Sequence, residues 1–167
     1  MTRMLLPFCL IACAGKPADT GSAAVESAPM DPCTRRPSPT LELGHGELGF
    51  ESLGDGTQTS ELIHGPQGGY HTNIALSATG LDATGHWAVD LEGWIGNALI
   101  GHTIPLASMR CNRAENELQA WGLLLIWDGV PAELHGQTAD IEATVMDSAG
   151  TEMTAVQSLI IWDPGLE

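Results

Sequence analysis

The feature that most constrains the fold is an alternation of apolar and polar residues with a period of two, which recurs after residue 40. In residues 70–79, Tyr, Thr, Ile, Leu and Ala stand at every second position, with His, Asn, Ala, Ser and Thr between them. Because successive side chains of a strand point to opposite faces, this pattern predicts a half-buried β-strand. Residues 87–92 and 140–145 repeat it, with acidic residues at the outward positions. No segment after residue 40 shows the period of an amphipathic helix.

Turn-forming residues separate the candidate strands, among them Asp55-Gly56 and the Gly-rich loop 65–69. Seven or eight short strands with turns between them predict an all-β fold, an antiparallel β-sandwich over residues 41–167. Residues 112–118 and 131–135 could each hold a single helical turn. The further strands are expected at 48–53, 58–63, 98–104, 118–127 and 153–162.

The stretch 118–127 is apolar on both faces. On a regular strand, Trp121, Leu123, Leu125 and Trp127 share one face, while Gly122, Leu124 and Ile126 share the other. Either the strand is buried on both faces, or one face meets a partner. Trp121 and Trp127 are therefore candidate interaction residues as well as candidate core residues, and Trp94 and Trp162 are secondary contact candidates.

The N-terminal residues resemble a bacterial lipoprotein signal peptide. An apolar run follows Arg3 and is too short to span a bilayer, which takes about 20 residues. Leu10-Ile11-Ala12-Cys13 resembles the lipobox, which implies removal of residues 1–12 and lipidation of Cys13 through its thiolate. Two or three acyl chains anchor a protein stably. An ordinary secretory peptide cut elsewhere is the alternative.

Residues 13–40 are expected to be a flexible tether, because Ala, Ser, Thr, Gly and Pro dominate there. Ala14 stands where an aspartate often retains lipoproteins in the inner membrane, which favours the outer membrane. The lipobox, the tether, the entry Pro-Thr-Leu-Glu-Leu-Gly (39–44), the loop 65–69 and the closing strands resemble envelope lipoproteins abundant in myxobacteria. This resemblance implies an immunoglobulin-like or fibronectin-like sandwich and supplies no catalytic residue.

The signal peptide assigns a role to two of the four cysteines and leaves the other two to pair. Cys9 is lost with the signal peptide and Cys13 carries lipid, so Cys33 and Cys111 remain in an oxidising space. We expect a disulfide between these two residues. Two free thiols, or pairing between chains, is the alternative.

The net charge of residues 41–167 limits the classes of molecule that the domain can bind. Residues 41–167 hold 18 Asp and Glu against two basic residues, Arg110 and Arg113, a net charge of −16. Such a domain is repelled by nucleic acid and by anionic lipid headgroups, which excludes a nucleic-acid role and indicates solubility or a cationic partner.

Candidate ligand residues are few. His64 and His71 flank the loop 65–69, where a hairpin could bring two imidazoles together for copper or zinc. Carboxylates near turns are candidate calcium ligands, although no Asp-x-Asp-x-Asp run occurs. They are Asp55, Asp82, Asp90, Asp128, Asp147 and Asp163.

Nucleophile, phosphate-loop and metalloprotease motifs are absent from the sequence, which disfavours an enzyme, and no cofactor is indicated. The sequence therefore predicts a non-catalytic, lipid-anchored envelope protein whose immunoglobulin-like domain engages a protein or a polymer. The alternative is an envelope protein that binds a small ligand or a calcium, copper or zinc ion.

Overall fold

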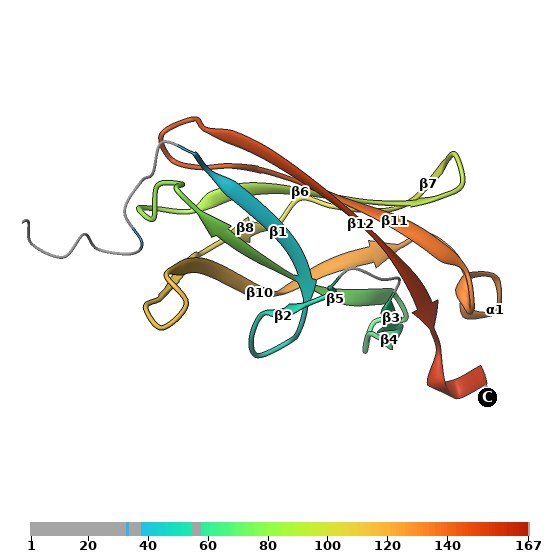
Figure 1. Ribbon diagram of the computed structural model, residues 1–167. Helices are drawn as coiled ribbons and strands as arrows, with labels where there is room; N and C mark the ends of the chain where they lie inside the picture. The colour runs from blue at the N-terminus through green and yellow to red at the C-terminus, as the bar shows by residue number, and fades with distance from the viewer. Residues whose placement is uncertain (1–32, 34–37, 55–57, 167) are drawn as a thin grey trace, which may run out of the picture.

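The structure, a computed structural model, describes Cys33 and residues 38–54 and 58–166. The predicted signal peptide, Cys13 and most of the tether lie outside these residues, as do Asp55 and Gly56. The described chain forms one mixed 12-stranded sheet with a single-turn helix and a 3-10 turn (Figure 1). The elements are β1 (Thr40–His45), β2 (Glu51–Ser52), β3 (Gln58–Glu61), β4 (Ile63–His64), β5 (Tyr70–Thr79), β6 (Trp87–Ile95), β7 (Ala98–Thr103), β8 (Leu106–Ala107), β9 (Arg110–Asn112), β10 (Glu117–Trp127), α1 (Pro131–Leu134), β11 (Thr138–Met146), β12 (Glu152–Trp162) and η1 (Pro164–Leu166).

The strands follow the order β2-β1-β5-β10-β7-β6-β11-β12-β3, with β4 paired to β5, β8 to β6 and β9 to β10. The sheet curves until β1 contacts β12, and the core lies inside this curve (Figure 1). The all-β prediction is confirmed. A wholly antiparallel arrangement is wrong, because β3 pairs in parallel with β12. Strand direction depends on the path of the chain between distant segments, which a local period does not encode.

The core confirms the period of two. Thr72, Ile74, Leu76 and Ala78 of β5 are buried, and β6 and β11 bury alternate residues in the same way. β5 is more than half-buried, however, because Ala75 and Ser77 on its other face are buried too. On that face, Ser77 donates a hydrogen bond to Glu117 of the neighbouring β10.

A β-bulge in β10 changes the predicted faces of that strand. Its register with β5 shifts between Ala120 and Leu123, and Gly122 adopts φ +68°, where glycine is favoured. Leu123, Leu125 and Trp127 are buried, as their shared face predicts. Trp121 is only half-buried, so its predicted place on that face is wrong. The extra residue at the bulge moves its side chain to the outer side of the sheet.

Two other local predictions fail and one holds. The strand expected at 48–53 is instead a loop that ends in the short β2, and the first long strand is β1. The helical turn expected at 112–118 is a β9–β10 hairpin. The turn expected at 131–135 is α1. Within the described ranges, no helix has the length and apolar character needed to cross a membrane.

A disulfide joins Cys33 to Cys111, as predicted, with the two Cα atoms 5.7 Å apart and a sequence separation of 78. Cys111 lies in β9, which pairs with the first residues of β10. The bond therefore ties the segment before the domain to one end of β10.

Candidate functional site

A groove of about 430 Å³ lies along β10 and is lined on its other side by residues 103–110. We call it the β10 groove. Trp121, Leu124 and Ile126 line it from β10, and Leu106 lines it from the opposite side. Arg110 marks one end, because β9 pairs with residues 117–119 of β10 there.

The apolar side chains of the β10 groove are open to solvent. Leu124, Ile126 and Leu106 are 41%, 45% and 74% exposed. A second, shallower pocket beside Leu124 and Ile126 is lined by Tyr70 and the loop 65–69, so the apolar surface continues across β5. Contiguous exposed apolar surface of this kind is typical of a binding site.

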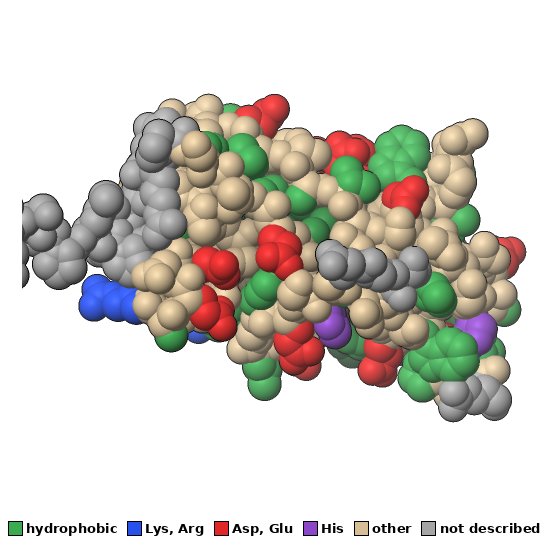
Figure 2. Space-filling model, in the orientation of Figure 1, with side chains coloured by type: hydrophobic (Ala, Val, Ile, Leu, Met, Phe, Trp, Pro, Cys, Tyr) green, Lys and Arg blue, Asp and Glu red, His purple; other side chains and the backbone are tan. Residues whose placement is uncertain are grey.

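The groove also holds one of the two basic side chains of the described domain, Arg110. Arg110 and Arg113 are the only Lys or Arg residues between 38 and 54 and between 58 and 166. The Arg110 guanidinium lies 4.8 Å from the centre of the Trp121 ring, a cation–π contact. Neither arginine forms an ion pair within the described residues. On the face drawn in Figure 2, basic side chains lie at one end while acidic ones are spread across the surface.

Two main-chain N–H groups of β10 near the groove are already hydrogen-bonded. Ile126 N–H donates to the Thr103 hydroxyl at 3.1 Å, and Gly122 N–H donates to the Gly46 carbonyl at 3.0 Å. Both of these main-chain donors are therefore satisfied within the described chain, and the exposed groups of the groove that are described above are side chains.

The four tryptophans predicted as contact residues have different environments in the structure. Trp127 is buried, with its indole N–H 3.3 Å from the Thr72 hydroxyl, and belongs to the core. Trp121 lines the groove. The Trp94 indole N–H donates to Glu92, and Trp162 packs against His135.

The predicted histidine pair is not brought together. His64 pairs across the β4–β5 hairpin with Tyr70, and His71 pairs with Ile63, so His64 and His71 point to opposite faces of it. His64 instead lies 3.0 Å from Asp163 and packs edge-on against the Tyr70 ring. The register of the hairpin explains why a shared metal site at His64 and His71 is wrong.

Most of the predicted calcium ligands serve the local backbone. Asp163 is buried and accepts a hydrogen bond from Gly165 N–H at 2.8 Å. This bond, followed by the contact with His64, holds the pKa of Asp163 below its usual value, against the opposing effect of burial. Asp147 accepts bonds from Ala149 and Thr151 N–H in the turn before β12. Asp82 and Asp128 join no group of three potential ligands in the described parts of the chain.

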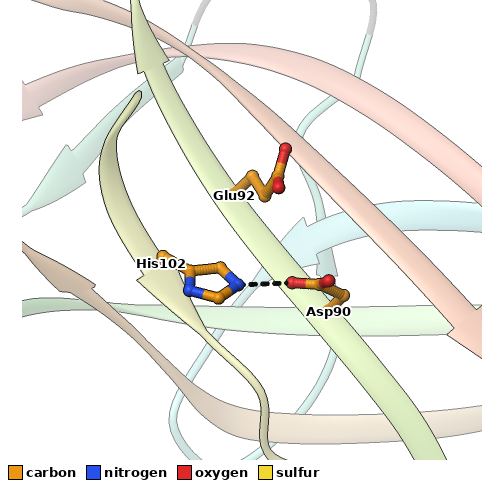
Figure 3. A group of neighbouring side chains, drawn as sticks. All are labelled: Asp90, Glu92 and His102. Carbon is orange, nitrogen blue, oxygen red and sulfur yellow. Dashed lines mark hydrogen bonds and ion pairs between the residues drawn. The ribbon is translucent and has the colours of Figure 1, made fainter. Parts of the chain in front are cut away.

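One cluster has the composition of a metal centre, and the sequence did not predict it. Asp90 and Glu92 of β6 and His102 of β7 project from the same side of the sheet (Figure 3). Their ligand atoms lie within 4.8 Å of one another, and no other such group of three occurs in the residues that the structure describes. The outward positions of Asp90 and Glu92 were visible in the alternation of 87–92. His102 was not, because its placement depends on the β6–β7 register.

Comparison of the sequence with models of known protein families and with curated proteins found no match. The geometry of the β10 groove and of the cluster on β6 and β7 therefore carries the functional argument.

Proposed function

We propose that the protein is a non-catalytic, lipid-anchored envelope protein whose β domain binds a protein partner in the β10 groove. The observation that carries the proposal is the exposure of Leu124 and Ile126 beside the half-buried Trp121. Trp and Arg dominate the energetics of protein interfaces, and Trp121 and Arg110 lie in contact here.

The lining favours a protein segment over a glycan polymer. Three of its exposed side chains, Leu106, Leu124 and Ile126, are aliphatic, and such surface is stabilised by burial against apolar side chains. Arg110, which has no carboxylate partner in the described chain, complements an acidic residue at one end of the bound segment. The expected partner therefore presents an apolar segment next to an Asp or Glu.

The anchor is supported by sequence. The lipobox-like residues 10–13 and the polar tether that follows are consistent with lipidation of Cys13 and attachment to the cell envelope. Ala14 favours the outer membrane over the inner one. The disulfide joins the tether to β9, next to the arginine end of the groove. A partner would then be bound near the point where the domain meets its tether.

The groove is tested by site-specific photo-crosslinking in the native envelope. A photoreactive residue at Leu124 is expected to capture one protein. The same residue at Val156 of β12, which is 59% exposed but outside the groove, is the matched control and should capture none. The captured protein is then purified, and its affinity for the full chain is measured.

Trp121→Ala and Arg110→Glu are each expected to weaken that affinity at least tenfold, a loss of about 1.4 kcal/mol that is common for interface hot spots. Equal capture at Leu124 and Val156, or an affinity insensitive to both substitutions, would refute the proposal. Capture of a glycan in place of a protein would refute the choice of partner.

The anchor is tested separately by metabolic labelling with a fatty acid. We expect label on the wild-type chain and on Cys9→Ala, and none on Cys13→Ala, because only the lipobox cysteine accepts the lipid. Label that persists in Cys13→Ala would overturn lipidation at this residue without bearing on the groove.

A further inference from the structure

We propose that Asp90, Glu92 and His102 form a binding site for a single zinc ion on the outer face of β6 and β7. This site does not depend on the function proposed for the β10 groove. Asp90 and Glu92 are two residues apart on β6 and share a face, and His102 of β7 pairs directly with Glu92. The strand register thus places three metal-binding side chains together.

The distances suit a small tetrahedral ion. His102 Nε2 lies 2.9 Å from Asp90 Oδ1 (Figure 3). Zinc bonds of about 2.0–2.1 Å place two ligand atoms of a tetrahedral site about 3.3 Å apart. The whole set lies within 4.8 Å, so that a small movement of the three side chains is enough to close it. The proton between His102 and Asp90 would be displaced by the metal.

The donor set selects the class of metal. One imidazole nitrogen and two carboxylates, with a water in the fourth position, is a ligand set that zinc accepts. Calcium and magnesium prefer oxygen ligands, so the imidazole of His102 disfavours both ions. Copper(II) competes for any such nitrogen and oxygen site, because it stands above zinc in the order of affinities.

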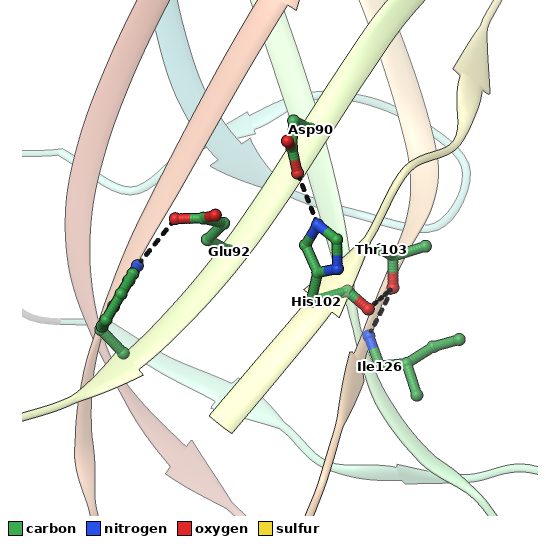
Figure 4. Close-up of polar contacts among 6 residues, drawn as sticks. Asp90, Glu92, His102, Thr103 and Ile126 are labelled. Carbon is green, nitrogen blue, oxygen red and sulfur yellow. Dashed lines mark hydrogen bonds and ion pairs between the residues drawn. The ribbon is translucent and has the colours of Figure 1, made fainter. Parts of the chain in front are cut away.

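The surroundings add negative charge and orient one ligand. Glu142 of β11 pairs directly with Glu92, so that two carboxylates of like charge stand side by side. Neither arginine of the described domain is on β6, β7 or β11. The Trp94 indole N–H donates to Glu92 at 3.1 Å, which fixes one carboxylate oxygen and leaves the other for the metal. Figure 4 shows Asp90, Glu92 and His102 on the neighbouring strands β6 and β7. A divalent cation would relieve the repulsion.

Titration calorimetry of the metal-free full chain with zinc tests the site. We expect one ion per chain. His102→Gln and Asp90→Asn should each weaken binding at least tenfold, the lower end of the loss when even an outer-shell partner of a metal is removed. His86→Gln is the matched control, because His86 is an exposed histidine whose ring bonds only to Ser108. It should bind zinc like the wild type.

Histidine ring spectra by NMR provide a second readout that does not depend on affinity. Zinc is expected to shift the ring resonances of His102 and to leave those of His64, His71 and His86 in place. The proposal is overturned if no heat and no shift are seen, if zinc binds His102→Gln as tightly as the wild type, or if another histidine ring responds first. Calcium at the same concentration should produce neither signal.

Discussion

The Trp127 ring packs so closely on Gly93 and Gly101 that a side chain added at Gly93 should destabilise the fold. Gly93 of β6 and Gly101 of β7 are paired across the two strands, and the Trp127 ring packs on both. A Cβ atom added at Gly93 would lie 2.5 Å from Trp127 Cζ3 and 2.6 Å from Cη2. Gly93 does not have positive φ, so that the backbone there accepts alanine and the obstacle is steric: mainly the Trp127 ring, with Leu125 Cδ2 at 3.2 Å as a second close neighbour.

The size of the effect follows from two opposing contributions. Replacing glycine by alanine restricts the unfolded chain and by itself stabilises by about 0.4–1 kcal/mol. Overpacking a core costs about 1–3 kcal/mol. The Trp127 ring cannot move away easily, because it is buried, rests on Gly101 and bonds Thr72. Gly93→Ala is therefore expected to lower the free energy of unfolding by about 1–2 kcal/mol, or the Tm by about 2–8 °C.

Thermal and urea denaturation of the full chain measure this loss. Gly69→Ala is the matched control, since a Cβ there meets no atom within 4 Å, and it should be neutral or slightly stabilising. Trp127→Phe removes the outer ring atoms, so that Gly93→Ala should cost less in that background. If Gly93→Ala is as stable as the wild type, or costs the same in the Trp127→Phe background as in the wild type, the packing argument is wrong.

Three further predictions concern the disulfide and two carboxylates. Cys33→Ser, Cys111→Ser and the double variant should each lower the free energy of unfolding by the same amount, because each removes the same bond. The chain-entropy estimate for a sequence separation of 78 is about 4.5 kcal/mol. Urea denaturation measures the loss, and a double variant that loses the sum of the two single losses would contradict the bond. The pKa of Asp163 is lower in the folded than in the unfolded chain, so its contribution to stability is complete above the unfolded value near 3.8 and is lost as pH falls through the folded one. Asp163→Asn should therefore make urea midpoints less dependent on pH below about pH 4 than in the wild type, and an unchanged slope would contradict this. Glu142→Gln should stabilise the zinc-free protein by about 0.2–1 kcal/mol, because it removes the repulsion from Glu92, and calorimetric melting should show the gain shrinking when zinc is added.

Three long strands were predictable from the sequence because apolar residues alternate along them. β5, β6 and β11 coincide with the alternating segments, since a period of two follows from burying one face more than the other, and β12 falls on the strand expected at 153–162. The two-residue strands β2, β4 and β8 were not predicted as separate strands, because two residues are too few to establish a period. Their positions follow from neighbours far away in the chain.

The candidate sites were less predictable than the strands, for two different reasons. Trp121 was assigned to the wrong face because Gly122 was not recognised as a bulge, although an isolated glycine within a strand pattern indicates one. The ligand cluster needed the pairing of Glu92 with His102, and no pattern within either strand contains that information. The disulfide was predictable because removing two cysteines on chemical grounds leaves a single pair.

The β10 groove and the ligand cluster share one structural origin. β7 meets β10 in the ladder at a single pair, Gly101 with Trp127, while it continues along β6. Beyond that point β7 and β10 separate, and the groove lies between them, with Thr103 on its wall. The pairing of β7 with β6 meanwhile holds His102 beside Glu92. Gly93 and Gly101 leave room for the Trp127 ring where β7 meets β10, so the last ladder contact before the two strands part depends on the absence of side chains at both positions.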